Sequence, residues 1–146
     1  MLRKSRPARR TGVVTTRQEA EWWLRAGERD LLSAIGLHQL SIFEGTAFHC
    51  QQAAEKLLKG LALARGATWQ RTHSCIRLVR TLVRAGLVVP PEVATACRRL
   101  DHHYVDARYP TGVGGPPDDF YDEVIADLAL TDCRLVQGFV EANLHG

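Results

Sequence analysis

Apolar residues recur at steps of three and four along five stretches of this chain, which is the period of an α-helix with one buried face. The stretches cover about residues 16–40, 43–65, 72–85, 91–109 and 118–144. None of them shows the two-residue alternation of a half-buried strand. Short connections between amphipathic helices favour antiparallel packing. The pattern therefore predicts an all-α protein, a single antiparallel, up-and-down bundle of four to five helices.

Residues with capping chemistry indicate where the helices should begin. Thr16 and Glu19 are spaced as a capping box at the first helix, and Thr72 is placed to cap the third. Asp118 or Asp119 is expected to cap the last helix. The core-facing side of this last helix is expected to carry Tyr121, Ile125, Leu128, Leu135 and Phe139.

The formal net charge of +3 is distributed unevenly along the chain. Residues 1–17 contain six of the 19 Lys and Arg residues and no acid, whereas residues 18–146 contain 13 basic and 16 acidic residues. We therefore expect residues 1–17 to be a basic, disordered arm, with phosphate contacts as the alternative, and residues 18–146 to be the helical domain. The longest apolar runs are well short of the roughly 20 residues of a membrane span, and no signal-peptide core is present. The expectation is a cytoplasmic protein with no membrane partner.

The four cysteines, Cys50, Cys75, Cys97 and Cys133, are more than 20 residues apart from one another and fall within helical apolar patterns. They form no CxxC pair, and no Cys/His group has zinc-ligand spacing. We expect reduced thiols in the core, which fits the cytosol, and no metal or cofactor.

One run of the second predicted helix, Phe48-His-Cys-Gln-Gln-Ala-Ala-Glu-Lys-Leu-Leu-Lys59, resembles the second-helix signature of HEPN domains (higher eukaryotes and prokaryotes nucleotide-binding). The signature has a Gln-Gln-Ala-Ala-Glu-Lys-x-x-Lys core. Three further landmarks agree with it in order: Trp22-Trp23 with Asp30-Leu31, His73, and Arg108-Tyr109-Pro110. The resemblance covers about residues 19–144 and implies a helical bundle whose function concerns nucleotides or RNA, of the type paired with minimal nucleotidyltransferases.

The resemblance implies two different functions. Some HEPN proteins are metal-independent endoribonucleases, often toxins, whose Arg-x4–6-His motif is completed across a homodimer. Others lack a working motif and serve as a non-catalytic helical partner or substrate-binding subunit of a minimal nucleotidyltransferase encoded nearby. The first expectation is a homodimeric, toxin–antitoxin-like component that binds RNA or a nucleotide. A dimeric scaffold that binds no nucleotide is a third alternative.

Arg98 and His103 have the spacing of the ribonuclease motif, with four residues between them. A histidine can transfer the proton of the 2′-hydroxyl or of the leaving group, and an arginine can stabilise the developing phosphoryl charge. However, Arg99 stands where ribonuclease members usually have a small polar residue or a histidine. Five helical steps also separate the two side chains by about 140°, so catalysis would need a site shared by two subunits. The alternative is a solvated face with local ion pairs.

Other polar residues are candidates for binding a nucleotide or RNA. On the second helix Gln52, Lys56 and Lys59 lie on one line with His49, although Glu55 and Lys59 have the spacing of an exposed salt bridge. His102 shares a helix face with Arg98. The set predicted to bind nucleotide or RNA is Gln52, Lys56, Lys59, His102, Arg108 and Tyr109.

Arg108 and Tyr109 lie at the end of the fourth predicted helix, beside a Gly/Pro-rich loop at 111–117. Arginine suits phosphate and tyrosine suits base stacking, but Arg108 could equally bond the last carbonyls of its own helix and Tyr109 could pack under the loop. The loop lacks the Lys-Ser/Thr of a P-loop. His73 is expected to be a buried hydrogen-bonding residue. Three tryptophans, Trp22, Trp23 and Trp69, are expected in the core or in a dimer interface.

Overall fold

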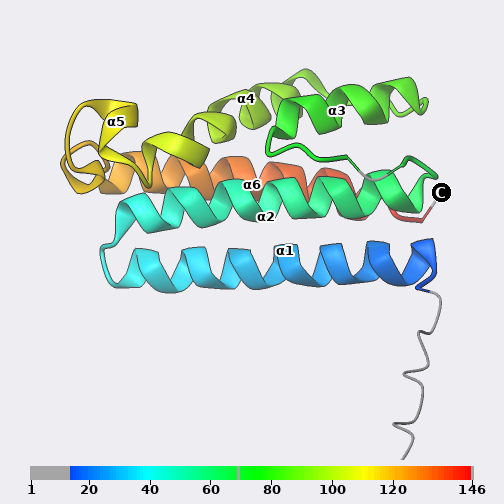
Figure 1. Ribbon diagram of the computed structural model, residues 1–146, viewed down its shortest axis with the longest axis horizontal. Coiled ribbons are helices and arrows are strands. Elements are labelled where there is room, and N and C mark those ends of the chain that lie inside the picture. Colours follow the sequence, from blue (N-terminus) through cyan, green and yellow to red (C-terminus); the bar gives the residue numbers. More distant parts are fainter. Residues whose placement is uncertain (1–13, 69, 146) are drawn as a thin grey trace, which may run out of the picture.

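The computed structural model describes residues 14–68 and 70–145, in which every regular element is helical (Figure 1). Its elements are α1 (Thr16–Gln39), α2 (Phe43–Ala64), α3 (Cys75–Arg84), α4 (Pro91–Asp106), α5 (Pro110–Val113), the 3-10 helix η1 (Pro117–Asp119) and α6 (Glu123–Asn143). The all-α prediction is therefore confirmed. Residues 1–13 of the predicted arm and Trp69 lie outside the described residues, whereas α1 begins within the range 1–17.

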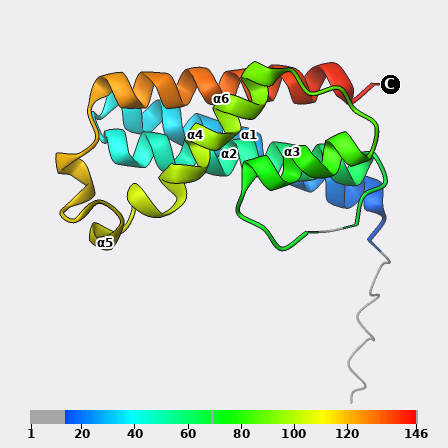
Figure 2. The same cartoon turned by 90° about the horizontal axis from the view of Figure 1, so that it is seen from above.

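Helix α2 is the centre of the bundle, with α1, α3, α4 and α6 all packed against it. Figure 1 shows α1 and α2 side by side and antiparallel, and α6 running along α2. Figure 2 shows that α4 crosses the bundle obliquely toward α5. Because it is covered on several sides, α2 is buried at apolar and polar positions alike, including Gln51, Glu55 and Lys59. None of the helices in the described residues is long and apolar enough to cross a membrane.

Two glycines bring α1 and α2 close together. A Cβ atom on Gly27 of α1 would lie 2.8 Å from Leu57 Cγ, and one on Gly60 of α2 would lie 2.7 Å from Leu24 Cγ. Both distances are shorter than van der Waals contact, so a side chain at either position would push the helices apart. This close approach brings side chains of α1 within reach of the polar residues of α2.

The cysteines form two buried pairs of free thiols, as the sequence suggested. Cys50 of α2 is hydrogen-bonded to Cys133 of α6, and Cys75 of α3 to Cys97 of α4. These hydrogen bonds, followed by burial, raise the pKa of Cys50 and of Cys75 well above the usual thiol value. The thiols of Cys50 and Cys75 are therefore protonated, unreactive parts of the core.

The expected caps of α1 and α3 are displaced by one and two residues. Thr15, rather than Thr16, caps α1 in a capping box with Gln18, and its Oγ1 accepts from Gln18 N at 3.1 Å. Ser74, rather than Thr72, caps α3 by accepting from Arg77 N. Thr72 instead accepts a hydrogen bond from Ser74 N at 3.1 Å and shapes the turn before the helix.

The last helix begins later than expected, because Asp122, and not Asp118 or Asp119, caps it by accepting from Ile125 N. The predicted loop at 111–117 contains most of α5 and the first residue of η1, and each of these two helices opens with a proline, which suits the first turn of a helix. The predicted core face was partly wrong, since Leu128 and Leu135 are exposed. Small residues occupy the buried face of α6 instead, among them Ala126, Ala129 and Cys133.

Candidate functional site

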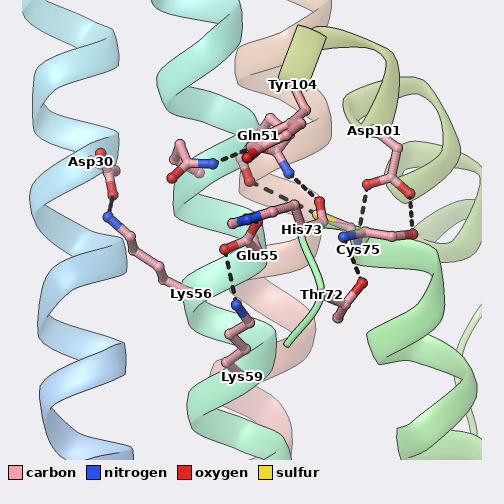
Figure 3. A network of polar contacts seen from close by, with 12 residues as sticks. Asp30, Gln51, Glu55, Lys56, Lys59, Thr72, His73, Cys75, Asp101 and Tyr104 are labelled. Carbon is pink, nitrogen blue, oxygen red and sulfur yellow. Dashed lines mark hydrogen bonds and ion pairs between the residues drawn. The ribbon is translucent and has the colours of Figure 1, made fainter. Parts of the chain in front are cut away.

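A network of polar side chains extends from α1 across α2 to the segment before α3 and to α4 (Figure 3). Two glutamines of α2 form one part of this network. Gln51, which is fully buried, donates from Nε2 to the backbone carbonyl of His73 at 2.8 Å, and Gln52 donates to Gln51 Oε1 at 2.7 Å. The glutamine pair therefore fixes the segment before α3 against α2. Gln52 itself is only half-buried, so part of it remains accessible to a ligand.

Glu55 is the buried acid of this network, with 2% of its surface exposed. Its Oε2 accepts from Lys59 Nζ at 3.2 Å, and its Oε1 is hydrogen-bonded to His73 Nδ1 at 3.1 Å. Lys59 is buried as well, and its ammonium lies 4.9 Å from the ring centroid of Trp23. The expected exposed salt bridge is thus a buried one, because α1 covers this side of α2. Lys59, predicted to bind a ligand, is fully engaged inside the protein.

His73 is more exposed than the sequence suggested, since 60% of its side chain is accessible to solvent. The segment before α3 lies over α2, so the histidine reaches Glu55 from outside. Its ring is stacked on that of Tyr104 of α4, with centroids 4.5 Å apart and planes at 14°. His73 therefore links the buried carboxylate to an aromatic residue near the surface.

Arg108 lies among three aromatic rings, with its guanidinium carbon 4.5 Å from the centroid of Tyr104, 4.7 Å from that of Phe48 and 4.8 Å from that of Tyr109. Its Nε donates to the backbone carbonyl of Tyr104 at 2.9 Å, the helix-end bond that was one of the two alternatives. Tyr109 is half exposed. We call Phe48, His73, Tyr104, Arg108 and Tyr109 the aromatic cluster. It presents flat rings and a planar cation, which suit stacking against a base.

Lys56 and His49 are both paired with Asp30 of α1. Lys56 Nζ lies 2.5 Å from Asp30 Oδ2, and His49 Nδ1 lies 2.9 Å from Asp30 Oδ1. Burial raises the pKa of Asp30, but the hydrogen bonds from His49 and Lys56 lower it by a larger total amount. The net shift of the Asp30 pKa is therefore downward. About a quarter of the Lys56 side chain is exposed, which leaves it at the edge of the network.

His103 points to the other side of α4, toward the segment before α6. Its Nδ1 is hydrogen-bonded to the hydroxyl of Tyr121 at 2.8 Å. Burial, followed by the charge of His102, lowers the pKa of His103, and burial raises the pKa of Tyr121 to about 12. His103 is therefore neutral near pH 7 and held by a protonated phenol. Within the described residues no hydrogen bond joins it to Arg98, which is exposed together with His102.

Two residues between Arg98 and His103 hold separate helices together, whereas the sequence suggested a solvated face with local ion pairs. Arg99 donates two hydrogen bonds to buried Asp132 of α6, at 2.9 and 2.7 Å. Asp101 accepts from Ser74 Oγ, Cys75 N and Ile76 N, at 2.9, 2.6 and 3.2 Å, and so satisfies amides at the start of α3. Both partnerships join separate helices.

The structure thus brings together Gln52, Lys56, Lys59, Arg108 and Tyr109 in one connected region. Within the described residues no hydrogen bond joins Arg98, His102 and His103 to one another. The sequence did not identify Glu55, Tyr104 and Tyr121 as parts of a site. Of these three residues, only Glu55 had a recognisable signal in the sequence, namely its salt-bridge spacing to Lys59. Tyr104 follows the apolar stripe of its helix and therefore resembles a core residue.

A single group of described residues has the geometry of metal ligands. His38, Glu123 and Asp127 place ligand atoms within 4.8 Å of one another. Both carboxylates are exposed, and His38 Nε2 is already hydrogen-bonded to Asp127 at 2.7 Å. The group lies outside the polar network and the aromatic cluster.

The model of the HEPN domain family matches residues 20–143, nearly the whole helical part. This chain belongs to the HEPN domain family. Two solved structures are similar to this HEPN domain, each over 86% of this chain and 98% of its own. The protein TT1696 from Thermus thermophilus has 34% identity and a TM-score of 0.81. The protein ST0689, an archaeal HEPN homologue, has 30% identity and a TM-score of 0.72.

No curated protein matches the chain. At the level of the family, HEPN membership supports a function that concerns nucleotides or RNA. HEPN domains also commonly dimerise.

Proposed function

We propose that this HEPN protein binds RNA and cleaves it as a metal-independent endoribonuclease, in a homodimeric, toxin–antitoxin-like module. Arg98 is the phosphate-stabilising residue and His103 the general acid/base. The observation that carries the proposal is the state of His103. Its imidazole is partly buried, neutral near pH 7 because its pKa is lowered, and fixed through Nδ1 by Tyr121.

A neutral, oriented imidazole suits proton transfer in RNA cleavage. With the Nδ1 proton donated to Tyr121, His103 Nε2 carries a lone pair that can accept the proton of the attacking 2′-hydroxyl. The imidazolium formed in this way can then protonate the leaving oxygen from Nε2, which returns His103 to its neutral form. No described residue is hydrogen-bonded to Nε2, so this atom has no competing partner within the described residues.

Arg98 of the same subunit does not meet this imidazole in the described structure. Both residues are on α4, five positions apart, and Arg98 is exposed. An exposed arginine on the surface of one subunit can stand beside the histidine of a second subunit around a two-fold axis. We therefore assign the two roles to residues of different subunits.

The aromatic cluster supports the binding part of the proposal. Tyr109 and His73 offer accessible rings, and Arg108 offers a planar cation held by its stacking partners. Bases of single-stranded RNA bind to such surfaces by stacking. We assign Gln52 and Lys56, both half-buried at the edge of the polar network, to contacts with polar groups of the same nucleotide.

The test measures cleavage of single-stranded RNA by wild type, Arg98→Ala, His103→Ala and His102→Ala, with and without EDTA. General acid–base groups contribute on the order of 10²–10⁴-fold, so His103→Ala should abolish detectable cleavage and retain RNA binding. Arg98→Ala should also reduce the rate, by about 10²–10³-fold, to almost no activity, because the phosphoryl charge loses its stabilisation. His102→Ala should not reduce the rate, and EDTA should have no effect. Equal rates for wild type and His103→Ala, or no cleavage by a folded wild-type dimer, would refute the ribonuclease proposal.

A second candidate is a non-catalytic partner of a minimal nucleotidyltransferase encoded nearby. One observation favours it: Arg99, at the position where ribonuclease members usually have a small polar residue or a histidine, is tied to Asp132 by two hydrogen bonds. Under this alternative the chain would cleave no RNA, and co-expression with a neighbouring nucleotidyltransferase would yield a stable complex. If the chain formed such a complex and also cleaved RNA, the ribonuclease assignment would still hold.

A further inference from the structure

Three arginines form a row along α3. Arg77, Arg80 and Arg84 follow one another at steps of three and four, so their side chains share one face of the helix, and all three are exposed. With Gln70, Arg71 and Thr72 from the preceding segment they line a surface hollow of about 440 Å³. We call Arg77, Arg80 and Arg84 the arginine row. It lies outside the ribonuclease motif and the aromatic cluster.

The row is part of a strongly basic stretch in a domain that is acidic as a whole. Between Glu55 and Glu92 the chain has seven basic residues and no acidic residue. Within the described residues no carboxylate lies within ion-pair distance of the row, and Arg84 Nε donates only to the backbone carbonyl of Arg80, at 3.4 Å. Asp101, the acid bound to α3, is occupied by Ser74 and by the first amides of the helix. The positive charge of the row is therefore not neutralised by the described part of the protein.

We propose that the arginine row binds the phosphodiester backbone of a single-stranded polynucleotide. Seven helical steps from Arg77 to Arg84 span about 10 Å, which exceeds the reach of one phosphate group and matches a series of phosphates along a strand. Guanidinium groups bind phosphate oxygens with paired hydrogen bonds. A free phosphate would use one or two of these arginines and leave the others unpaired.

The row is connected to the aromatic cluster. Residues 70–74 lead from the hollow to the start of α3, and His73 within them is stacked on Tyr104. A strand whose phosphates follow α3 would therefore bring its next bases to the aromatic cluster. This inference rests on the RNA-binding part of the proposed function and is independent of cleavage.

The test uses the full chain and a fluorescent 2′-O-methyl oligonucleotide of about 12 nucleotides, which lacks the 2′-hydroxyl nucleophile and so remains intact. The variant Arg77→Gln/Arg80→Gln/Arg84→Gln removes the row but keeps good helix formers. The control Arg25→Gln/Arg29→Gln/Arg134→Gln removes the same charge from exposed positions of α1 and α6. An abasic oligomer of equal length, ATP and inorganic phosphate are tested as competitors, and thermal unfolding verifies the fold of each variant.

Three lost phosphate contacts should lower the slope of log affinity against log salt by about 2, since each contributes about 0.7 on single strands. Between 50 and 200 mM salt, wild type should then lose roughly 20-fold more affinity than the row variant. The control variant should behave like wild type, and the abasic oligomer should compete far better than ATP or phosphate. Such a result in a chain that cleaves no RNA would support the row and refute the ribonuclease proposal.

Three outcomes would overturn the inference. The first is that the folded row variant and wild type bind the oligonucleotide with equal affinity and equal dependence of affinity on salt, even if wild type cleaves RNA. Another is equal loss in the row and control variants, which would indicate a general charge effect. The third is competition by ATP or phosphate as effective as that by the abasic oligomer, which would make a free phosphate group the ligand.

Discussion

The ion pair between Glu55 and Lys59 should stabilise the bundle only as long as both partners are present. Both side chains are almost completely buried, with 3% and 6% of their surfaces exposed, and their charged atoms are 3.2 Å apart. Replacing Glu55 by methionine leaves the Lys59 ammonium with one partner among the described residues, the ring of Trp23. A buried charge without its counter-ion is strongly destabilising.

Removing one partner of a buried pair costs about 3–5 kcal/mol. The contact with Trp23 offsets part of this, so we expect a loss of about 3 kcal/mol in the free energy of unfolding for Glu55→Met. In a folded domain of about 130 residues, an unfolding entropy of roughly 0.27 kcal/mol/K converts this loss into a fall in Tm of about 11 °C. Glu55→Met/Lys59→Met removes both charges and should lie within about 1 kcal/mol of wild type.

The assay is urea unfolding followed by circular dichroism for the two single variants and the double variant. A coupling free energy of at least about 2 kcal/mol is expected from this cycle. Arg17 and Glu21 provide the matched control, because they are also four residues apart but have side chains 91% and 63% exposed. Glu21→Met should cost less than about 1 kcal/mol. A similar cost for Glu55→Met and Glu21→Met, or a double variant less stable than both singles, would refute the reasoning.

Two further predictions concern the start of the chain and the link between α1 and α2. Deleting residues 1–13 should leave Tm nearly unchanged, because this part has few apolar residues, whereas deleting residues 1–17 also removes the Thr15 cap and should cost about 1 kcal/mol in thermal unfolding. Equal Tm values for both truncations would contradict this. The pKa of Asp30 is lowered below 3.8 in the folded state, so its stabilising effect is present above pH 3.8 and is lost as the pH falls through the folded value. Asp30→Asn should therefore be less stable than wild type at pH 6 and lose less stability on acidification, and parallel Tm profiles would refute this.

Local patterns predicted the helices well but not their first residues. The period of apolar residues determined the helical class. Gly66 and Gly86 adopt positive φ directly after α2 and α3, a conformation that commonly ends a helix and that glycine favours. At the first helix, however, Thr15 with Gln18 and Thr16 with Glu19 have the same spacing and comparable capping chemistry. The difference in free energy between such neighbouring caps is small, so the sequence does not decide between them.

The sequence predicted only those features of the site that arise within a single helix. The second-helix motif identified the polar residues of α2, but a helical wheel gives α2 a solvent-facing side, whereas four other helices cover it and bury Lys59. The partners His73 and Tyr104 are 31 positions apart in the sequence, and Asp101 reaches the start of α3 from 26 positions beyond Cys75. Contacts of this kind arise from packing and have no periodic signal.

The central claim is that Arg98 of one subunit and His103 of another form the ribonuclease site, and mixing two inactive variants tests it most directly. Light scattering should first give a dimer mass for wild type and for both variants. Random exchange between equal amounts of Arg98→Ala and His103→Ala makes half of the dimers mixed, each with one intact site out of two. We predict that the mixture regains about a quarter of the wild-type cleavage rate although neither variant is active alone. A mixture that remains inactive after verified subunit exchange, or a monomeric wild-type protein, would contradict the shared site.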